Sequence, residues 1–378
     1  MVLQSHPFRS ADNLGPATAG GLFDVRAKPE ERLHPLFRML RQRADLAPAR
    51  GLICELHGCA FRDAQPDYVE AFQAGGFDEA LFRLFLFALF DAAGHRVELG
   101  HRDLAFVLSK AGTTAAVDVL TVGTPVSGIE PQVDASRPPL AGRRSVGIGG
   151  CLFCELHGRQ WHQPPAAGHP FVVAIQDFDH REMASGAPPD ALLHFLFGGS
   201  DMSRDLNDLF PRGFFGEQEA ENVSAILFCN DATIAKFNRL GQERHAGDVA
   251  RMLRHGACLG DDHGDWTPAG YVYEVGRRGA CKEAWNEGTV LIHNPHAAQP
   301  LPADWIGASA EIQLRDGRIV ERLAQGFHPI SSHTELLGQD TPAWWVEKRM
   351  SLLARECTAH CPGPAPAPSV ALAPRNSG

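Results

Sequence analysis

The most restrictive feature of this sequence is residues 80–90, ALFRLFLFALF, in which ten of eleven side chains are apolar. The spacing of Leu81, Phe85 and Leu89 predicts an α-helix. The Gly75–Gly76 pair before it predicts a break from a preceding helix. A helix that is apolar on most sides must be buried on most sides, so the rest of the chain has to build a substantial core around it.

Length and composition allow such a core. The chain has 378 residues, 44% of them hydrophobic, which is enough for one large domain or two ordinary ones. No apolar run approaches the roughly 20 residues that span a bilayer, and the first residues lack the basic-then-apolar order of a secretory signal. We therefore expect a cytoplasmic globular protein that has no membrane partner. Nine irregularly spaced cysteines favour free thiols over a disulfide framework.

The charge balance limits the kinds of partner. A formal net charge of -10 argues against a protein that coats nucleic acid by bulk electrostatics, although it leaves room for a local basic groove. Lysine is scarce, so a mechanism that needs a catalytic lysine has few candidates. They are Lys28, Lys110, Lys236, Lys282 and Lys348.

Three short strand-like segments rich in Val and Leu follow the apolar helix. They are HRVEL (95–99), DLAFVLSK (103–110) and AAVDVLTV (115–122). A polar loop over about 123–149, a helix over 151–161 and a buried strand over 170–178 come next. This order, αβββαβ, is that of the restriction-endonuclease-like core, in which the active site lies on the second and third strands. The predicted fold class is α/β, with this core and additional C-terminal α/β elements.

The rest of the chain predicts an organisation around that core. A helix over 188–198, a strand over 223–231, a helix over 233–241 and a strand over 288–295 precede a hairpin over 310–323, whose turn is Asp316–Gly317. We expect four segments: an N-terminal arm and helix (1–50), the nuclease-like core (51–200), a C-terminal α/β extension packed on it (201–350) and a mostly disordered tail (351–378).

Two carboxylates on the predicted strands are candidate metal ligands. Asp103 begins the second strand and Asp118 lies inside the third, where a lone carboxylate would be costly to bury without a partner. Metal-dependent nucleases use converging carboxylates to hold Mg²⁺ or Mn²⁺, often with a lysine nearby. Here Leu120 stands where the PD-(D/E)XK pattern has its lysine, and Thr121 follows it.

These segments resemble a little-characterised bacterial family with a PD-(D/E)XK, restriction-endonuclease-like core. The likeness covers about residues 66–335. It rests on GFDEALFRLFLFALF, RDLAF, VDVLTV, GHPFVVAIQDF, SAILFCNDATIAKFNRLG and AWNEGTVLIHNPHAAQPLP. The resemblance implies a metal-dependent nuclease that acts on nucleic acid, with Asp103 and Asp118 as metal ligands.

The chain departs from the family at three positions. Arg83 stands where the family helix has Glu, and Glu155 and His157 stand where the segment after the long loop has Lys. We expect Asp103, Asp118, Glu155 and His157 to be catalytic, with His157 in place of the missing lysine. We expect Asp103, Asp118, Glu70 and Asp177 to bind the metal. Because Arg cannot bind a cation and Glu reverses the charge of Lys, the site is either remodelled or inactive.

A pentapeptide, CELHG, occurs twice, at 54–58 and 154–158, and suggests a different kind of site. The spacing of Cys151 and Cys154 suits zinc, and His157 would extend the same helical stripe. A second pair would have to come from Cys54 with His57 or Cys59, and the stripe could equally be core. Zinc is therefore the alternative to Mg²⁺ or Mn²⁺.

Three other clusters each allow a functional and a structural interpretation. QDFDH (176–180) ends a strand with two acids and a histidine, where α/β proteins commonly build sites. GDDHGD (260–265) has the density of a hard-metal site but is typical of a solvated loop. HNPH (293–296) follows an apolar strand and reads either as a site or as a capped loop.

Two hypotheses of different classes follow. The first is a PD-(D/E)XK-like nuclease or its inactive descendant. The second is a non-catalytic protein on the same core that binds a protein partner, a second copy of the chain or a metal held by Cys and His.

Overall fold

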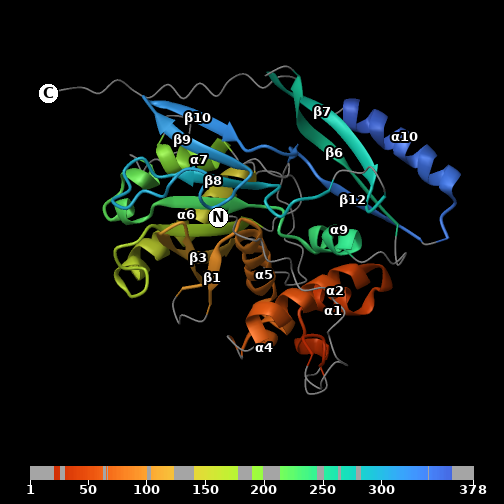
Figure 1. The fold of residues 1–378 in the computed structure, drawn as a ribbon, viewed down its shortest axis with the longest axis horizontal. Helices are drawn as coiled ribbons and strands as arrows, with labels where there is room; N and C mark the ends of the chain where they lie inside the picture. Colours follow the sequence, from red (N-terminus) through yellow and green to blue (C-terminus); the bar gives the residue numbers. More distant parts are fainter. Residues whose placement is uncertain are drawn as a thin grey trace, which may run out of the picture.

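The chain folds into a mixed α/β protein with one large sheet and a second, small antiparallel sheet, seen in a computed structural model (Figure 1). The structure describes residues 21–25, 30–62, 65, 67–99, 104–122, 140–177, 190–198, 213–244, 251–262, 265–277, 282–338 and 340–359. Within this part of the chain, no helix is both long and apolar enough to cross a membrane.

The large sheet has eight strands in the order β1-β2-β3-β4-β5-β8-β9-β10. They are β1 (Arg96–Glu98), β2 (Phe106–Lys110), β3 (Thr113–Val122), β4 (Phe171–Asp177), β5 (Ala225–Cys229), β8 (Thr289–His293), β9 (Ala310–Arg315) and β10 (Arg318–Leu323). The sheet runs through both of the segments that the sequence predicted as core and extension, because β4 pairs with β5.

The first half of the sheet is an antiparallel meander joined to a parallel strand. β1, β2 and β3 pair antiparallel in chain order. The chain then crosses over through α6 (Leu140–Gly158) and returns as β4, which is parallel to β3 with Asp118 opposite Val173. Preceded by α5 (Phe77–Ala92), these elements have the predicted order of helix, three strands, helix and strand.

Helices cover both faces of this sheet (Figure 1). On one face, α2 (Ala47–Leu56), α5 and α9 (Ile234–Arg244) share a core cluster with alternate residues of the strands. On the other, α6 and α7 (Asp190–Phe197) belong to a second cluster. Two short helices, α1 (Pro35–Gln42) and α4 (Tyr68–Gln73), add to the first face.

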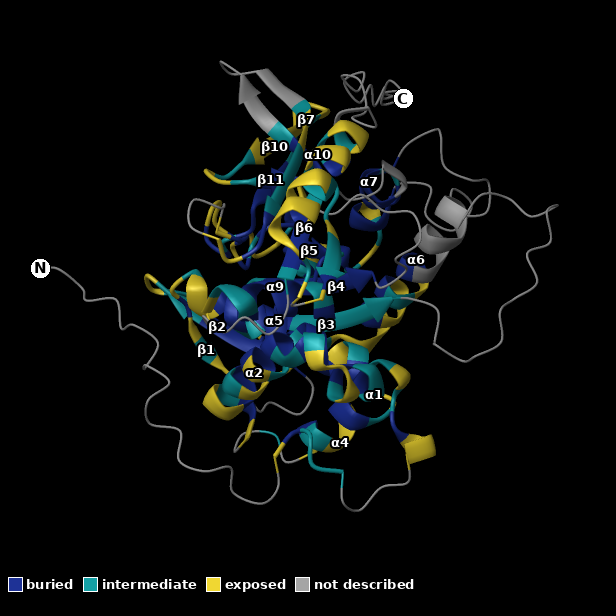
Figure 2. Cartoon of the chain, turned by 90° about the vertical axis from the view of Figure 1, so that its right-hand side faces the viewer, coloured by how far each residue is buried: buried dark blue, intermediate teal, exposed yellow. Residues whose placement is uncertain are grey.

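The two clusters divide each strand by its alternation. In β3, Ala115 and Val117 face the first cluster, whereas Ala116 faces the second. The central strands β4 and β5 are buried along their whole length and are dark in Figure 2, whereas most of β3 is partly buried and teal. As predicted, the apolar helix is enclosed: ten of the sixteen residues of α5 are buried. Gly75 and Gly76 separate it from α4.

The small sheet lies beside α9 and was not predicted. It consists of β6 (Arg251–Asp262), β7 (Asp265–Glu274), β11 (His328–Pro329) and β12 (His333–Leu337), all paired antiparallel to β6. The helix α10 (Ala343–Ala359) packs against it through a small apolar cluster that includes Leu253, Val346 and Leu353.

Short helical turns complete the described part of the chain. They are η2 (Glu30–Arg32), η3 (Ala44–Leu46), η4 (His57–Phe61), η5 (Gln160–His162), η6 (Phe214–Gly216) and η7 (Ala220–Asn222).

The structure confirms the hairpin and corrects one boundary. Arg315 pairs with Arg318, and the turn residues Asp316 and Gly317 have φ values of 50° and 73°. The loop predicted over 123–149 is wrong in its last part, because α6 begins at Leu140. The helix predicted over 151–161 therefore begins before residue 151, and Ile148 is already buried against the sheet. Of the predicted tail, residues 351–359 are helical and the rest lies outside the described residues.

Candidate active site

Two carboxyl groups meet between β3 and α6. Asp118 lies in the middle of β3 on the face that α6 covers, and Glu155 projects from α6 toward it, so that the two carboxyl groups are hydrogen-bonded. Leu152 and Leu156 flank Glu155 on the same helical face and are buried in the second core cluster. The apolar residues of α6 therefore fix the helix so that Glu155 faces the strand.

Burial and charge make this pair hold a proton. Glu155 is only 8% exposed, and burial, the nearby charge of Asp118 and the hydrogen bond between them raise its pKa to about 8. Burial also raises the pKa of Asp118. The N–H of Val119 donates to Asp118 Oδ1 at 2.8 Å, and this hydrogen bond lowers the pKa in part. Two adjacent carboxylates cannot both ionise cheaply, so at neutral pH Glu155 is protonated and donates to Asp118.

A third acid and a base, both on α5, act electrostatically on Asp118. The charge of Glu79 raises the pKa of Asp118, and that of Arg83 lowers it. Glu79 Oε1 and Arg83 Nη1 form an ion pair at 3.8 Å across one helical turn. Arg83 was singled out from the sequence, whereas Glu79 was not. The signal was available, because residues four apart on a helix share a face.

Of the other two predicted catalytic residues, His157 is described, and it is not brought to this pair. His157 follows Glu155 by two positions, about 200° around a helix, and is exposed; its Nδ1 donates to the carbonyl of Phe153 at 2.8 Å. The structure thus directs Glu155 and His157 to opposite sides of α6. Asp103 lies outside the described residues.

The two remaining predicted metal ligands are in different surroundings. Glu70 is an exposed residue of α4. Asp177 is buried at the end of β4, opposite Val122 and four positions beyond the partner of Asp118, which corresponds to about 13 Å along a strand. Among the described residues, no three His, Cys, Asp or Glu side chains are arranged to hold a metal ion.

The cysteines of the two pentapeptides belong to separate helices. Cys54 lies in the last turn of α2 and Cys59 lies in η4, whereas Cys151 and Cys154 lie on α6. All four are free thiols, and Cys54, Cys59 and Cys154 are exposed. The zinc arrangement that the sequence suggested is not assembled within the described residues.

The remaining clusters are only partly described. His293 Nε2 lies 3.4 Å from Glu311 Oε2 on β9, and Asn294 caps the loop after it by accepting from the N–H of His296 at 2.8 Å. HNPH therefore has a structural role as a capped loop. Asp179 and His180 of QDFDH and His263 of GDDHGD lie outside the described residues.

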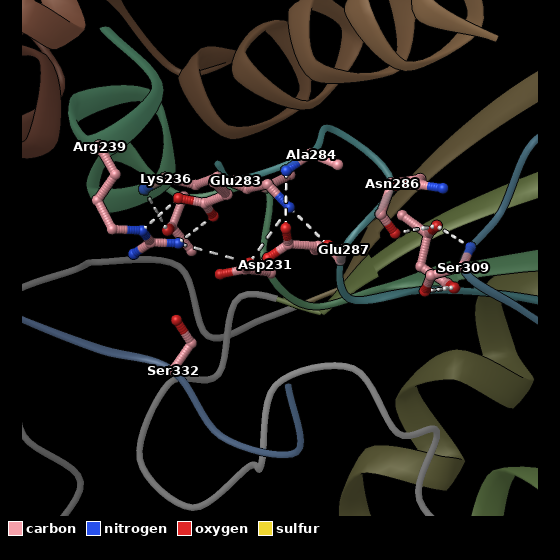
Figure 3. A network of polar contacts seen from close by, with 12 residues as sticks. Asp231, Lys236, Arg239, Glu283, Ala284, Asn286, Glu287, Ser309 and Ser332 are labelled. Atoms are coloured by element: carbon pink, nitrogen blue, oxygen red, sulfur yellow. Dashed lines mark hydrogen bonds and ion pairs between the residues drawn. The ribbon is translucent and has the colours of Figure 1, made fainter. Parts of the chain in front are cut away.

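Charged residues from the second half of the chain form another group, which is fully buried (Figure 3). Arg239 on α9 binds Glu283 through two hydrogen bonds of 2.7 Å, and Lys236 lies 3.3 Å from Asp231 at the end of β5. Arg254 on β6, 0% exposed, binds Glu287 at 2.8 Å.

We call these six residues the buried ion network: Asp231, Lys236, Arg239, Arg254, Glu283 and Glu287. Three positive charges balance three negative ones, and each of the six side chains is at most 5% exposed. Charges that are paired and inaccessible stabilise an arrangement of elements and offer no site to a substrate. Among the described acidic residues, therefore, only the Asp118–Glu155 pair combines raised pKa values with a position on the predicted active-site strand.

No family model matches the chain, and no curated protein or solved structure is significantly similar to it.

Proposed function

We propose that residues 77–177 form a restriction-endonuclease-like core, and that the Asp118–Glu155 pair binds Mg²⁺ or Mn²⁺ for the hydrolysis of phosphodiester bonds in nucleic acid. The fold supports this through the antiparallel β1-β2-β3 meander and the crossover helix to a parallel β4. The observation that carries the proposal is the buried pair of carboxyl groups on β3 and α6.

The donor set fits a hard cation. Mg²⁺ and Mn²⁺ prefer carboxylate oxygens, and Glu155 Oε1 is buried without a hydrogen-bond partner. Asp118 and Glu155 would hold the ion, with Asp103 as the further acid that the sequence assigns, and the negative charge of Glu79 acts on Asp118. The ion would polarise the phosphate and lower the pKa of an attacking water.

The chain's own groups would prepare this site. Glu155 gives up its proton when a cation binds, so that both carboxylates become ligands. Leu120 stands at the position where the PD-(D/E)XK pattern has lysine, so this position supplies no positive charge. Arg83 is the cation that acts on Asp118, and its role would be to attract the substrate phosphate.

A cleavage assay tests the proposal. The wild-type chain should cut single- or double-stranded DNA or RNA with Mg²⁺ or Mn²⁺ and not with EDTA. Asp118→Asn and Glu155→Gln should each lower the rate at least about a hundredfold, since outer-shell partners alone cost 10- to 100-fold. Glu347→Gln, an exposed change on α10, is the matched control. At pH 6, Glu155→Gln should keep the wild-type melting temperature, because Glu155 is already protonated there.

A second candidate is a non-catalytic protein on the same core. It is favoured by Leu120 and by the lack of a three-residue metal group among the described residues. Calorimetric titration with Mn²⁺ separates the candidates. Binding that releases about one proton at pH 7 and is lost in Asp118→Asn, without cleavage of any nucleic acid, would replace catalysis by cation binding. Absence of both binding and cleavage would refute the proposed site.

A further inference from the structure

A separate open cavity of about 540 Å³ lies at the C-terminal end of α6. Phe153, Leu156 and His157 line one side, and the turn between η6 and η7 lines the other with Glu217 and Glu219. Glu155 and Asp118 are not among the lining residues. The cavity is within the size range of small-ligand sites.

A guanidinium group of the chain itself already lines the cavity. Arg159 Nη2 donates to Glu219 Oε1 at 2.5 Å. Both residues have left-handed backbones, with φ values of 52° and 72°, although neither is glycine. Both residues therefore adopt a backbone conformation that carries some cost for a non-glycine residue. The Arg159 side chain is 58% exposed, so another guanidinium group can replace it at Glu219.

The surroundings favour a second cationic group. Phe153 is 48% exposed, and its ring lies 4.1 Å from that of His157. His157 Nδ1 donates to the Phe153 carbonyl, which leaves Nε2 as an acceptor in the neutral ring. The two carboxylates against one Arg give the lining a formal charge of −1. An exposed aromatic ring beside carboxylates is a good environment for a planar cation and a poor one for a phosphate.

We propose that this cavity binds a guanidinium group, such as the side chain of an arginine on a partner polypeptide, in exchange for Arg159 at Glu219. The site is independent of the cation site between β3 and α6. The two can fail separately, because guanidinium binding needs no divalent metal and no cleavage.

Titration of the full chain with N-acetyl-arginine amide, followed by NMR or calorimetry in EDTA, tests the proposal. The uncharged isostere N-acetyl-citrulline amide should bind at least about tenfold more weakly, since a charge-assisted hydrogen bond is lost. Glu219→Gln and Phe153→Ala should weaken arginine binding, whereas Glu347→Gln should not. Arg159→Ala should strengthen it, because the internal competitor is removed. A purely structural Arg159–Glu219 pair would give no such gain.

The remaining outcomes are also decisive. Preference for agmatine over N-acetyl-arginine amide would keep the guanidinium site but assign it to a free small molecule. Equal affinity for the citrulline isostere, or weaker binding by Arg159→Ala, would overturn the proposal. Tighter binding of adenosine than of arginine would overturn it as well and assign the cavity to a nucleobase. No binding of any of these probes at millimolar concentration would refute the site.

Discussion

The same five residues acquire different roles in the two CELHG copies. In the copy at 54–58, the histidine is buried and the glutamate is partly exposed; in the copy at 154–158, the glutamate is buried and the histidine is exposed. The first copy spans the passage from α2 into η4, the second ends α6, and both bury the leucine. The side of each helix that meets the core differs, and this selects which polar residue is enclosed.

The buried Glu155 makes the protein's stability depend on pH in a particular direction. Its carboxyl titrates near 4.5 when unfolded and at about 8 when folded. Between these values, the folded protein holds a proton that the unfolded chain has lost, so the free energy of unfolding falls as pH rises, by up to about 1.4 kcal/mol per pH unit. The contribution is complete below pH 4.5 and is lost through about pH 8.

Glu155→Gln cannot ionise, so its melting temperature should decrease less between pH 6 and 9 than that of the wild type. Thermal unfolding in metal-free buffer over this range measures the difference. Glu243, whose pKa burial raises to about 7, titrates in both proteins and cancels in the comparison. Parallel pH profiles for the two proteins would show that Glu155 is ionised in the folded state.

At the scale of the elements, close packing depends on a single glycine in α9. A Cβ atom at Gly241 would lie 2.3 Å from the carbonyl oxygen of Pro48 on α2, a backbone atom that cannot move aside alone. These two helices are extensively packed against each other, and both belong to the face that carries α5. Glycine, normally unfavourable inside a helix, is here required for contact.

Two glycine-to-alanine changes should therefore have opposite effects. Gly241→Ala should lower the free energy of unfolding by about 1–3 kcal/mol through overpacking. Gly150→Ala, inside α6 with no atom within 4 Å of the added Cβ, should raise it by up to about 1 kcal/mol through helix propensity. Chemical denaturation measures both. Stabilisation by both changes would mean that α2 and α9 are not in contact.

At the scale of the whole molecule, the buried ion network joins the two sheets. Arg239 on α9 reaches Glu283 and, through Nη1, Thr334 on β12 at 2.7 Å. Arg254 on β6 reaches Glu287, just before β8 of the large sheet. Glu283 has a lowered pKa because Arg239 and Arg254 together outweigh its burial. The two sheets are thus held by charges that are desolvated and mutually compensated.

Breaking this network should be costly. Glu283→Gln leaves Arg239 and Arg254 buried with less compensation, and it should lower the free energy of unfolding by about 3–5 kcal/mol. Glu335→Gln removes a partly exposed partner of Arg349, and it should cost less than about 1 kcal/mol. Urea denaturation of the two variants compares them directly. Equal effects would exclude a joining role for the network.

The prediction from sequence succeeded for elements with local signals and failed where charges are buried. Periodicity predicted α5 and the strands of the large sheet, and Asp316–Gly317 predicted the hairpin turn. β6 was missed because its sequence, RMLRHGACLGDD, lacks a regular alternation of apolar and polar residues. Arg254 is enclosed there only because Glu283 and Glu287 arrive from a distant segment.

The sequence by itself determined the order along the chain of the strands in the large sheet and the burial of α5, because apolar spacing and turn residues act over a few positions. It also singled out Asp118 as a carboxylate that needs a partner. Only the tertiary structure decided that Glu155 is that partner, that the charge of Glu79 acts on Asp118 and that His157 points away. Those relations depend on how α5 and α6 are rotated against the sheet, and packing of the whole core sets that rotation.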